Sequence, residues 1–199
     1  AGSTGSGHAS FDEAAFVTYM LQNYTPDELQ FVMIDPKQVQ LIPYEDIPHL
    51  WRPLAMTPDS TKDAITDLHA EMVRRFQLWL NQGVRFIADY NAKSGENLPS
   101  IILLVTEVAD LMMIDEDFYG KKFKQLSERG RAVGIHLYLA TQRPSQDVLS
   151  DTLLNEVRGR LVFSVSNEED SIRLLGEPGA EKITEPGRLI FVDRRLGVK

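Results

Sequence analysis

The chain has 199 residues, of which 43% are hydrophobic and 25% charged, and its formal net charge at pH 7 is −8. This composition is typical of a globular protein, and we expect residues 1–199 to form a single domain within a longer protein. The chain contains no cysteine, which excludes disulfide bonds and thiolate zinc sites. Its acidic balance argues against a generally basic surface for nucleic acid, and no apolar run reaches the ~18 residues of a membrane span.

The first ten residues, AGSTGSGHAS, are rich in glycine and in small hydroxyl side chains. They resemble the pattern G-x-x-x-x-G-K-[ST], in which backbone N–H groups surround phosphates, the lysine contacts the β- and γ-phosphates, and the hydroxyl holds Mg²⁺. His8 stands at the lysine position and Ala9 at the Ser/Thr position. A linker or cloning remnant is the plain alternative for such a stretch.

Continuous apolar runs alternate with helical patterns along the rest of the chain. Such runs are typical of strands buried on both faces, as in a parallel sheet covered by helices. Strands are predicted at residues 31–35, 101–106, 135–141, 161–165 and 189–192. Helices are predicted at residues 11–23, from a capping box at 60–63 onward, and at 118–132, with a turn at 91–99. The alternation predicts an α/β fold of three layers.

Five short motifs follow in a consistent order: M-I-D-P-K at 33–37, I-P-H-L at 47–50, V-A-D-L-M-M at 108–113, G-I-H-L at 134–137 and A-T-Q-R-P-S at 140–145. Together with the first ten residues, they resemble the FtsK/SpoIIIE family of DNA translocases. The resemblance implies a RecA-like P-loop ATPase domain with a mostly parallel central sheet flanked by helices. It also implies a central strand before Ala1.

The resemblance further implies ATP and Mg²⁺ as cofactors and double-stranded DNA as a partner. It implies a homo-oligomer, a hexameric ring around that DNA, which acts in chromosome partition at cell division. We expect this chain to be cytoplasmic and without membrane contact, although many members of the family have membrane spans upstream.

The family pattern also defines the loop that would bind nucleotide. Its predicted residues are Gly2, Ser3, Thr4, Gly5, Ser6, Gly7, His8, Ala9 and Ser10. The stretch from this loop to Phe31 is one residue longer than the family usually has. Ser10 could therefore hold the Mg²⁺-ligand position, with His8 and Ala9 together replacing the lysine. Neither register contains a lysine.

A second candidate site is the apolar run 101–105 followed by Thr106 and Glu107. In the family this Walker B segment ends in Asp-Glu, where the first acid holds Mg²⁺ and the second polarises the attacking water. Glu107 is therefore the candidate general base, and Thr106 stands where the metal ligand belongs. The plain alternative is a buried strand that ends in one glutamate.

Two further residues match the family's catalytic positions. Gln142 follows a predicted strand, where the family has a polar sensor of the γ-phosphate. Arg131 matches an arginine that resembles an arginine finger for the ATP of a neighbouring subunit. A cation at a helix C-terminus is the alternative reading of Arg131.

The tightest basic cluster is formed by Lys121, Lys122 and Lys124. Lysines in the pore of a translocase can contact DNA phosphates without reading sequence. A solvated helix face is the more frequent meaning of such a run.

Three functional hypotheses follow. The first is an ATP-binding motor domain that resembles a double-stranded DNA translocase and is impaired in hydrolysis. The second is a pseudo-ATPase subunit that keeps the ring interface without hydrolysing ATP. The third is a related ring ATPase of secretion or conjugation, against which the motifs at 34–37 and 47–50 argue.

Overall fold

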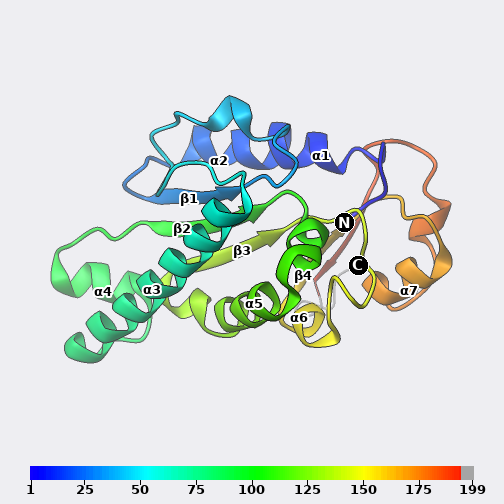
Figure 1. The fold of residues 1–199 in the computed structure, drawn as a ribbon. Helices are drawn as coiled ribbons and strands as arrows, with labels where there is room; N and C mark the ends of the chain where they lie inside the picture. The colour runs from blue at the N-terminus through cyan, green and yellow to red at the C-terminus, as the bar shows by residue number, and fades with distance from the viewer. Residues whose placement is uncertain (194–199) are drawn as a thin grey trace.

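A central sheet of three parallel strands organises the computed structural model, which describes residues 1–193 (Figure 1). The strands are β1 (Leu29–Ile34), β2 (Ser100–Val105) and β3 (Ile135–Leu139), in the order β1-β2-β3. The three apolar runs that predicted them are confirmed. Because all three strands are parallel, their carboxyl ends lie at one edge of the sheet, where the segments that follow them meet.

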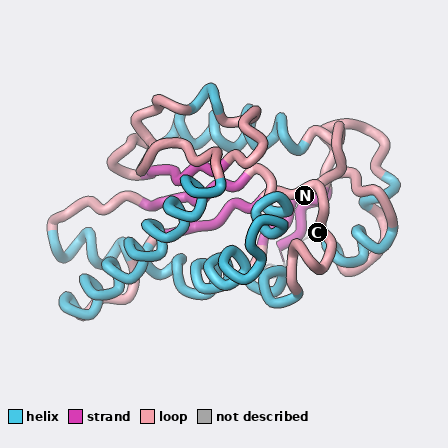
Figure 2. Tube along the Cα trace, in the orientation of Figure 1, coloured by secondary structure: helices cyan, strands magenta, loops and turns pink. Residues whose placement is uncertain are grey.

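The two faces of this sheet pack against different helices. Phe31 and Met33 of β1 lie in one apolar cluster with Val17, whereas Val32 and Ile34 lie in a larger cluster on the opposite face. Side chains of a strand alternate between faces, so a continuous apolar run is what a sheet covered on both sides requires. The three layers are visible in Figure 2.

The first face is covered by one continuous helical rod, made of α1 (His8–Ser10), the π-helix η1 (Phe11–Val17) and α2 (Thr18–Asn23). A helix was predicted here, but its π-helical part was not. A π-helix bonds each N–H to the carbonyl five residues before it and is rare in proteins.

The opposite face is covered by α3 (Pro58–Gln82) and α5 (Val108–Arg129). The predicted capping box at 60–63 is wrong, because the box is formed by Thr57 and Ser60. The Thr57 hydroxyl accepts from the Ser60 amide at 3.2 Å, and the Ser60 hydroxyl accepts from the Thr57 amide at 2.9 Å. The helix therefore begins at Pro58, two residues earlier than expected.

The other helix boundaries also differ from the predictions. Helix α5 begins ten residues before residue 118, breaks its helical dihedral angles at Asp115 and passes into η3 (Gly130–Val133). The predicted turn at 91–99 overlaps α4 (Ile87–Ser94), which Gly95 ends at a φ of 74°. The remaining short helices were not predicted; they are η2 (Ile42–Tyr44), α6 (Asp151–Glu156), α7 (Glu168–Leu175) and η4 (Ala180–Lys182).

The last two strands do not extend the parallel sheet. β4 (Gly159–Val162) and β5 (Ile190–Asp193) pair with each other in antiparallel fashion as a separate two-stranded sheet. The expectation that all predicted strands share one mostly parallel sheet is corrected in this respect. Apolar runs report burial and not strand direction, so the pattern could place these strands but could not orient them.

The N-terminal residues lie between the two sheets. The Ala1 amine donates to the Leu161 carbonyl at 2.7 Å, and the Phe163 amide donates to the Ala1 carbonyl at 2.9 Å. On the other side, the Gly2 amide donates to the Thr141 carbonyl at 3.2 Å. The chain therefore enters its first loop parallel to β4. The expected strand before Ala1 stays a prediction.

Candidate nucleotide site

Four segments meet at the carboxyl edge of the sheet. They are the glycine-rich loop of residues 2–8 and the residues that follow β1, β2 and β3. In open α/β sheets this edge is where ligands bind. Its side chains come from segments distant in sequence, so the hydrogen bonds between them define the site.

The loop is shaped by two glycines that cannot be replaced without displacing backbone or a packed ring. A Cβ on Gly2 would lie 2.7 Å from the Cβ of Phe163, and a Cβ on Gly7 would lie 2.7 Å from the Gly187 amide nitrogen. Gly7 also has a φ of 93° and precedes α1 directly. Loop residues 3–6 and residues 183–186 enclose a cavity of about 130 Å³.

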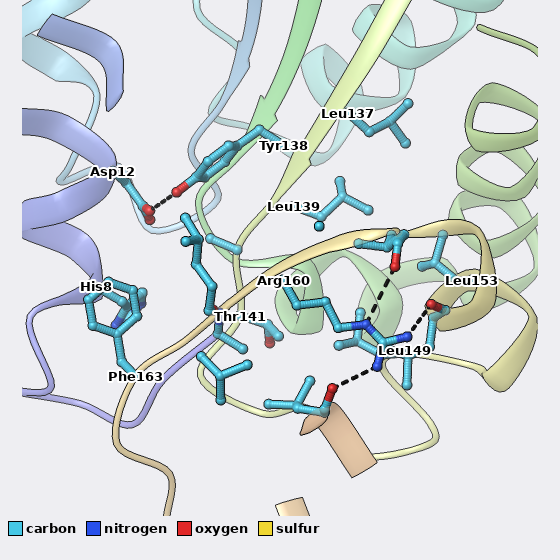
Figure 3. Close-up of a pocket in the computed structure, with 18 residues that line it drawn as sticks. His8, Asp12, Leu137, Tyr138, Leu139, Thr141, Leu149, Leu153, Arg160 and Phe163 are labelled. Carbon is cyan, nitrogen blue, oxygen red and sulfur yellow. Dashed lines mark hydrogen bonds between the residues drawn. The ribbon is translucent and has the colours of Figure 1, made fainter. Parts of the chain in front are cut away.

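His8 does not act as a cation in this loop. Its side chain is buried, its Nδ1 lies 3.5 Å from the Ser6 hydroxyl, and its ring lies 6.3 Å from the ring of Phe163 (Figure 3). Burial lowers the pKa of His8 below its usual 6.5. The imidazole is therefore neutral at pH 7, and the position expected for lysine carries no charge.

Glu107 is a buried carboxylate fixed from several sides. It is the N-cap of α5, and it accepts hydrogen bonds from the Thr141 hydroxyl at 2.6 Å and the Gln142 amide at 3.2 Å. Lys37 forms an ion pair with it at 3.2 Å. Sequence reasoning placed Glu107 and Gln142 here but missed Lys37 and Thr141, although both lie inside the family motifs.

Thr106 donates a hydrogen bond where the family has an acid. Its hydroxyl contacts Oδ1 of Asp35 at 3.0 Å. The other oxygen, Oδ2, accepts three backbone N–H groups at 2.7 to 2.9 Å, from residues 39, 40 and 41. The pairing of Ile34 with Val105 could have revealed this contact, because it places the next residue of each strand side by side.

Ser10 and Thr106, the predicted Mg²⁺ ligands, stay predictions. Ser10 is exposed at the end of α1, and Thr106 is engaged with Asp35. Within residues 1–193, no group of three or more His, Cys, Asp or Glu side chains is placed to hold a metal ion.

Gln142 connects the loop to Glu107. The Thr4 hydroxyl donates to its Oε1 at 2.8 Å, while its backbone amide donates to Glu107. Thr4, Gln142 and Glu107 thus form one chain of contacts across the carboxyl edge of the sheet, and the role of Gln142 as a γ-phosphate sensor stays a prediction.

Arg131 lies at the other end of the sheet. It is exposed on η3, just before the amino end of β3, so it does not reach Glu107 of its own chain. Helix α3 fixes this turn, because Trp79 donates to the Ala132 carbonyl at 3.2 Å and the buried Arg75 donates to the Val133 carbonyl at 2.9 Å.

The predicted DNA-binding lysines lie on one helix, α5. Lys121 and Lys124 are exposed, and the Lys122 ammonium lies 6.0 Å from the ring centre of Phe118. Lys124 is 3.9 Å from Glu128. The cluster lies on a helix face that also carries the acidic Glu128, and its contact with DNA stays a prediction.

The sequence profile of the FtsK/SpoIIIE family matches residues 1–146. The chain belongs to the FtsK/SpoIIIE family. It is 41% identical over 201 aligned residues to a DNA translocase FtsK of Streptococcus pyogenes serotype M3 and 40% identical to one of Lactococcus lactis subsp. cremoris. Both alignments cover 96% of this chain, and the chain spans about a quarter of the length of these curated relatives (25% and 26%).

Solved structures place the fold among the RecA-like P-loop ATPases. The monomer form of the pCW3 conjugation coupling protein TcpA with ATPγS has a TM-score of 0.83 and 25% identity, over 97% of this chain and 56% of that chain. The cytoplasmic domain of the Thermomonospora curvata type VII secretion ATPase EccC has a TM-score of 0.87 and 24% identity, over 97% of this chain and 23% of that chain. In residues 1–193 no helix combines the length and apolarity needed to cross a membrane.

We expect Thr106→Asp to destabilise the protein in the absence of metal. The new carboxylate would lie beside the buried Asp35 and would replace a hydrogen-bond donor with a second negative charge. The expected loss is roughly 2 to 4 kcal/mol at pH 7. In the folded protein the two neighbouring carboxyl groups bind one proton at a higher pH than they do in the unfolded chain. The loss of stability should therefore shrink as the pH falls toward about 5.

Urea unfolding at pH 7 and pH 5, with and without Mg²⁺, tests this expectation. Thr106→Ser is the matched control, since it keeps the hydroxyl. A Thr106→Asp protein as stable as its parent without metal would contradict the proximity of the two carboxyl groups.

Proposed function

We propose that this chain is an ATP-binding motor domain that resembles a double-stranded DNA translocase of chromosome segregation and is impaired in ATP hydrolysis. The observation that carries the proposal is the paired change in the pocket. A neutral, buried His8 stands at the lysine position, and the Thr106 hydroxyl stands where a carboxylate would hold Mg²⁺. The two charges that act on the phosphates in phosphoryl transfer are thus both absent.

The retained parts of the pocket support nucleotide binding. The glycine-rich loop keeps its shape, and Glu107 and Gln142 are linked to it through Thr4. The related TcpA was solved with ATPγS, which supports ATP as the ligand here. Mg²⁺ would accompany the phosphates of the nucleotide, since the described side chains offer it no cluster of ligands.

The position of Arg131 supports assembly into a ring. An exposed arginine at the opposite end of the sheet from Glu107 would act in catalysis at the site of a neighbouring copy and not at its own. We therefore propose a homo-oligomer, a hexamer by family resemblance, which encloses double-stranded DNA in the cytoplasm. The lysines of α5 are the candidate contacts to DNA phosphates.

A pseudo-ATPase subunit is the second candidate, and the burial of His8 against Phe163 favours it. A secretion or conjugation ATPase has support from the structural likeness to EccC and TcpA. The higher sequence identity to DNA translocases supports the first proposal over this one.

The π-helix supports one register of the loop over the other. Gly7 is left-handed and α1 starts at His8, while the seven residues of η1 are wound as a π-helix. A π-helix has wider turns than an α-helix and holds more residues in the same length. The one residue by which the stretch from the loop to Phe31 exceeds the family's usual length can therefore be accommodated in η1. We therefore place His8 at the lysine position and Ala9, not Ser10, at the Ser/Thr position.

We expect ATP hydrolysis to be very slow even with DNA present. Loss of one charge-stabilising group commonly reduces the rate by about 10²-fold or more, and two are missing here. Steady-state ATPase assays of the longer parent protein with double-stranded DNA measure this rate. Turnover on the order of 1–100 s⁻¹, which is usual for kinases, would overturn the proposal.

We expect His8→Lys with Ala9→Ser and Thr106→Asp to restore ATP binding in the parent protein. The triple change returns one positive and one negative charge together. The competing register is represented by His8→Lys with Ala9 deleted, so that lysine precedes Ser10. Calorimetric titration with ATP and Mg²⁺ compares the two proteins.

Recovery in the triple variant alone supports the register given by η1. Recovery in the deletion variant alone would refute that register. Should neither protein bind ATP while both stay folded, the disabled-motor account fails, and the chain is better described as a scaffold that keeps the RecA-like shape for assembly.

A further inference from the structure

A lysine outside the loop contacts the candidate catalytic carboxylate. Lys37 follows β1, and its ammonium lies 3.2 Å from Oε2 of Glu107. Its side chain is 42% exposed, whereas that of Glu107 is 4% exposed. One end of this ion pair is therefore fixed inside the protein, and the other end lies at the solvent boundary of the site.

The turn that carries Lys37 is held in a strained shape. Gln38, the next residue, has a φ of 58° and is the only described non-glycine residue with a positive φ. Backbone of this kind persists only where its surroundings enforce it, and it concentrates at functional sites. Here the buried Asp35 enforces it by accepting the amides of residues 39, 40 and 41.

Thr106, the residue at the Walker B acid position of the family, also contacts this turn. Its hydroxyl binds the same Asp35 carboxylate that organises the turn. Thr106, which stands in place of the family's acidic metal ligand, therefore helps to hold the turn that carries Lys37.

The charge of Lys37 reaches the glycine-rich loop. It helps to lower the pKa of the loop residue His8, which burial lowers most and which the charge of Glu107 raises. It also opposes the rise that burial causes in the pKa of Asp110. The contacts from Thr4 through Gln142 to Glu107 lead from the loop to the same ammonium.

We propose that Lys37 is the residue that binds the phosphates of a polyphosphate ligand at this site, in place of the lysine that the loop lacks. The inference rests on the proposed nucleotide binding and names the cation responsible. Lys37 is the exposed member of the ion pair, and Glu107 keeps the hydrogen bonds from Thr141 and Gln142 when the ammonium turns away. A polyphosphate offers more negative charge than one carboxylate, and the flexible lysine stem allows the ammonium to turn toward it.

Glu107 does not depend on Lys37 for its position. The Thr141 hydroxyl and the Gln142 amide still hold the carboxylate after the lysine has moved. Phosphate binding by Lys37 would therefore release Glu107 from its ion pair without displacing it.

Calorimetric titration of the chain with ATP and, separately, with inorganic pyrophosphate tests the proposal, both without Mg²⁺. Lys37→Met and Lys37→Gln should lower the affinity for both ligands roughly tenfold or more, while the affinity of Lys37→Arg should stay within about threefold of that of the unsubstituted chain. Lys93→Met is the matched control; Lys93 is an exposed lysine of α4 that bonds to the Gln82 carbonyl. Thermal unfolding verifies that each variant is folded.

The outcomes separate this proposal from the proposed function. If the unsubstituted chain binds ATP and neither Lys37→Met nor Lys37→Gln lowers the affinity, the assignment of Lys37 is overturned and nucleotide binding stands. If the unsubstituted chain binds pyrophosphate through Lys37 but does not bind ATP, the assignment stands and the proposed function fails. If the unsubstituted chain binds neither ligand, the assignment and the proposed function are both overturned.

Discussion

Two buried carboxylates at the ends of neighbouring parallel strands govern the geometry of this site. Asp35 follows β1 and Glu107 follows β2, and both are almost fully excluded from water. A buried charge is tolerated only when hydrogen bonds or opposite charges replace its hydration. The protein provides these from its own groups: backbone amides and Thr106 for Asp35, and Thr141, Gln142 and Lys37 for Glu107. The segments that supply the donors are thereby drawn together.

This constraint explains why the two unusual residues of the pocket belong together. A lysine at position 8 would be a buried cation, and an acid at position 106 would be a second anion beside Asp35. A neutral His8 and a hydroxyl at Thr106 remove one charge of each sign, so the pocket stays balanced with no phosphate or metal present. Changing one position alone leaves a buried charge without compensation.

The sequence was informative where burial alone decides the structure. Three apolar runs located β1, β2 and β3, and the parallel arrangement brought Glu107 and Gln142 to one edge, as the family motifs suggested. Strand direction, the π-helix and the start of α3 depend on pairing and on local hydrogen bonds, which hydrophobic patterns do not encode. The contact of Thr106 with Asp35 and that of Lys37 with Glu107 both require the register of two strands 70 residues apart.

The loop also depends on a structure that lies outside the pocket. Its first residues are fixed by hydrogen bonds to Leu161, Phe163 and Ser164, in and just after β4, and to Thr141 just after β3. Beside them lies the apolar cavity of Figure 3, which residues of both β3 and β4 line, and Leu139 and Leu153 contribute to its walls. The buried Arg160 closes part of it by donating to the carbonyls of residues 154 and 174. The residues that begin the loop therefore join the two sheets by backbone hydrogen bonds, beside the apolar core that Val105 and Val162 share. A change in the spacing of β3 and β4 would be transmitted through these bonds to Gly2 and so to the position of His8.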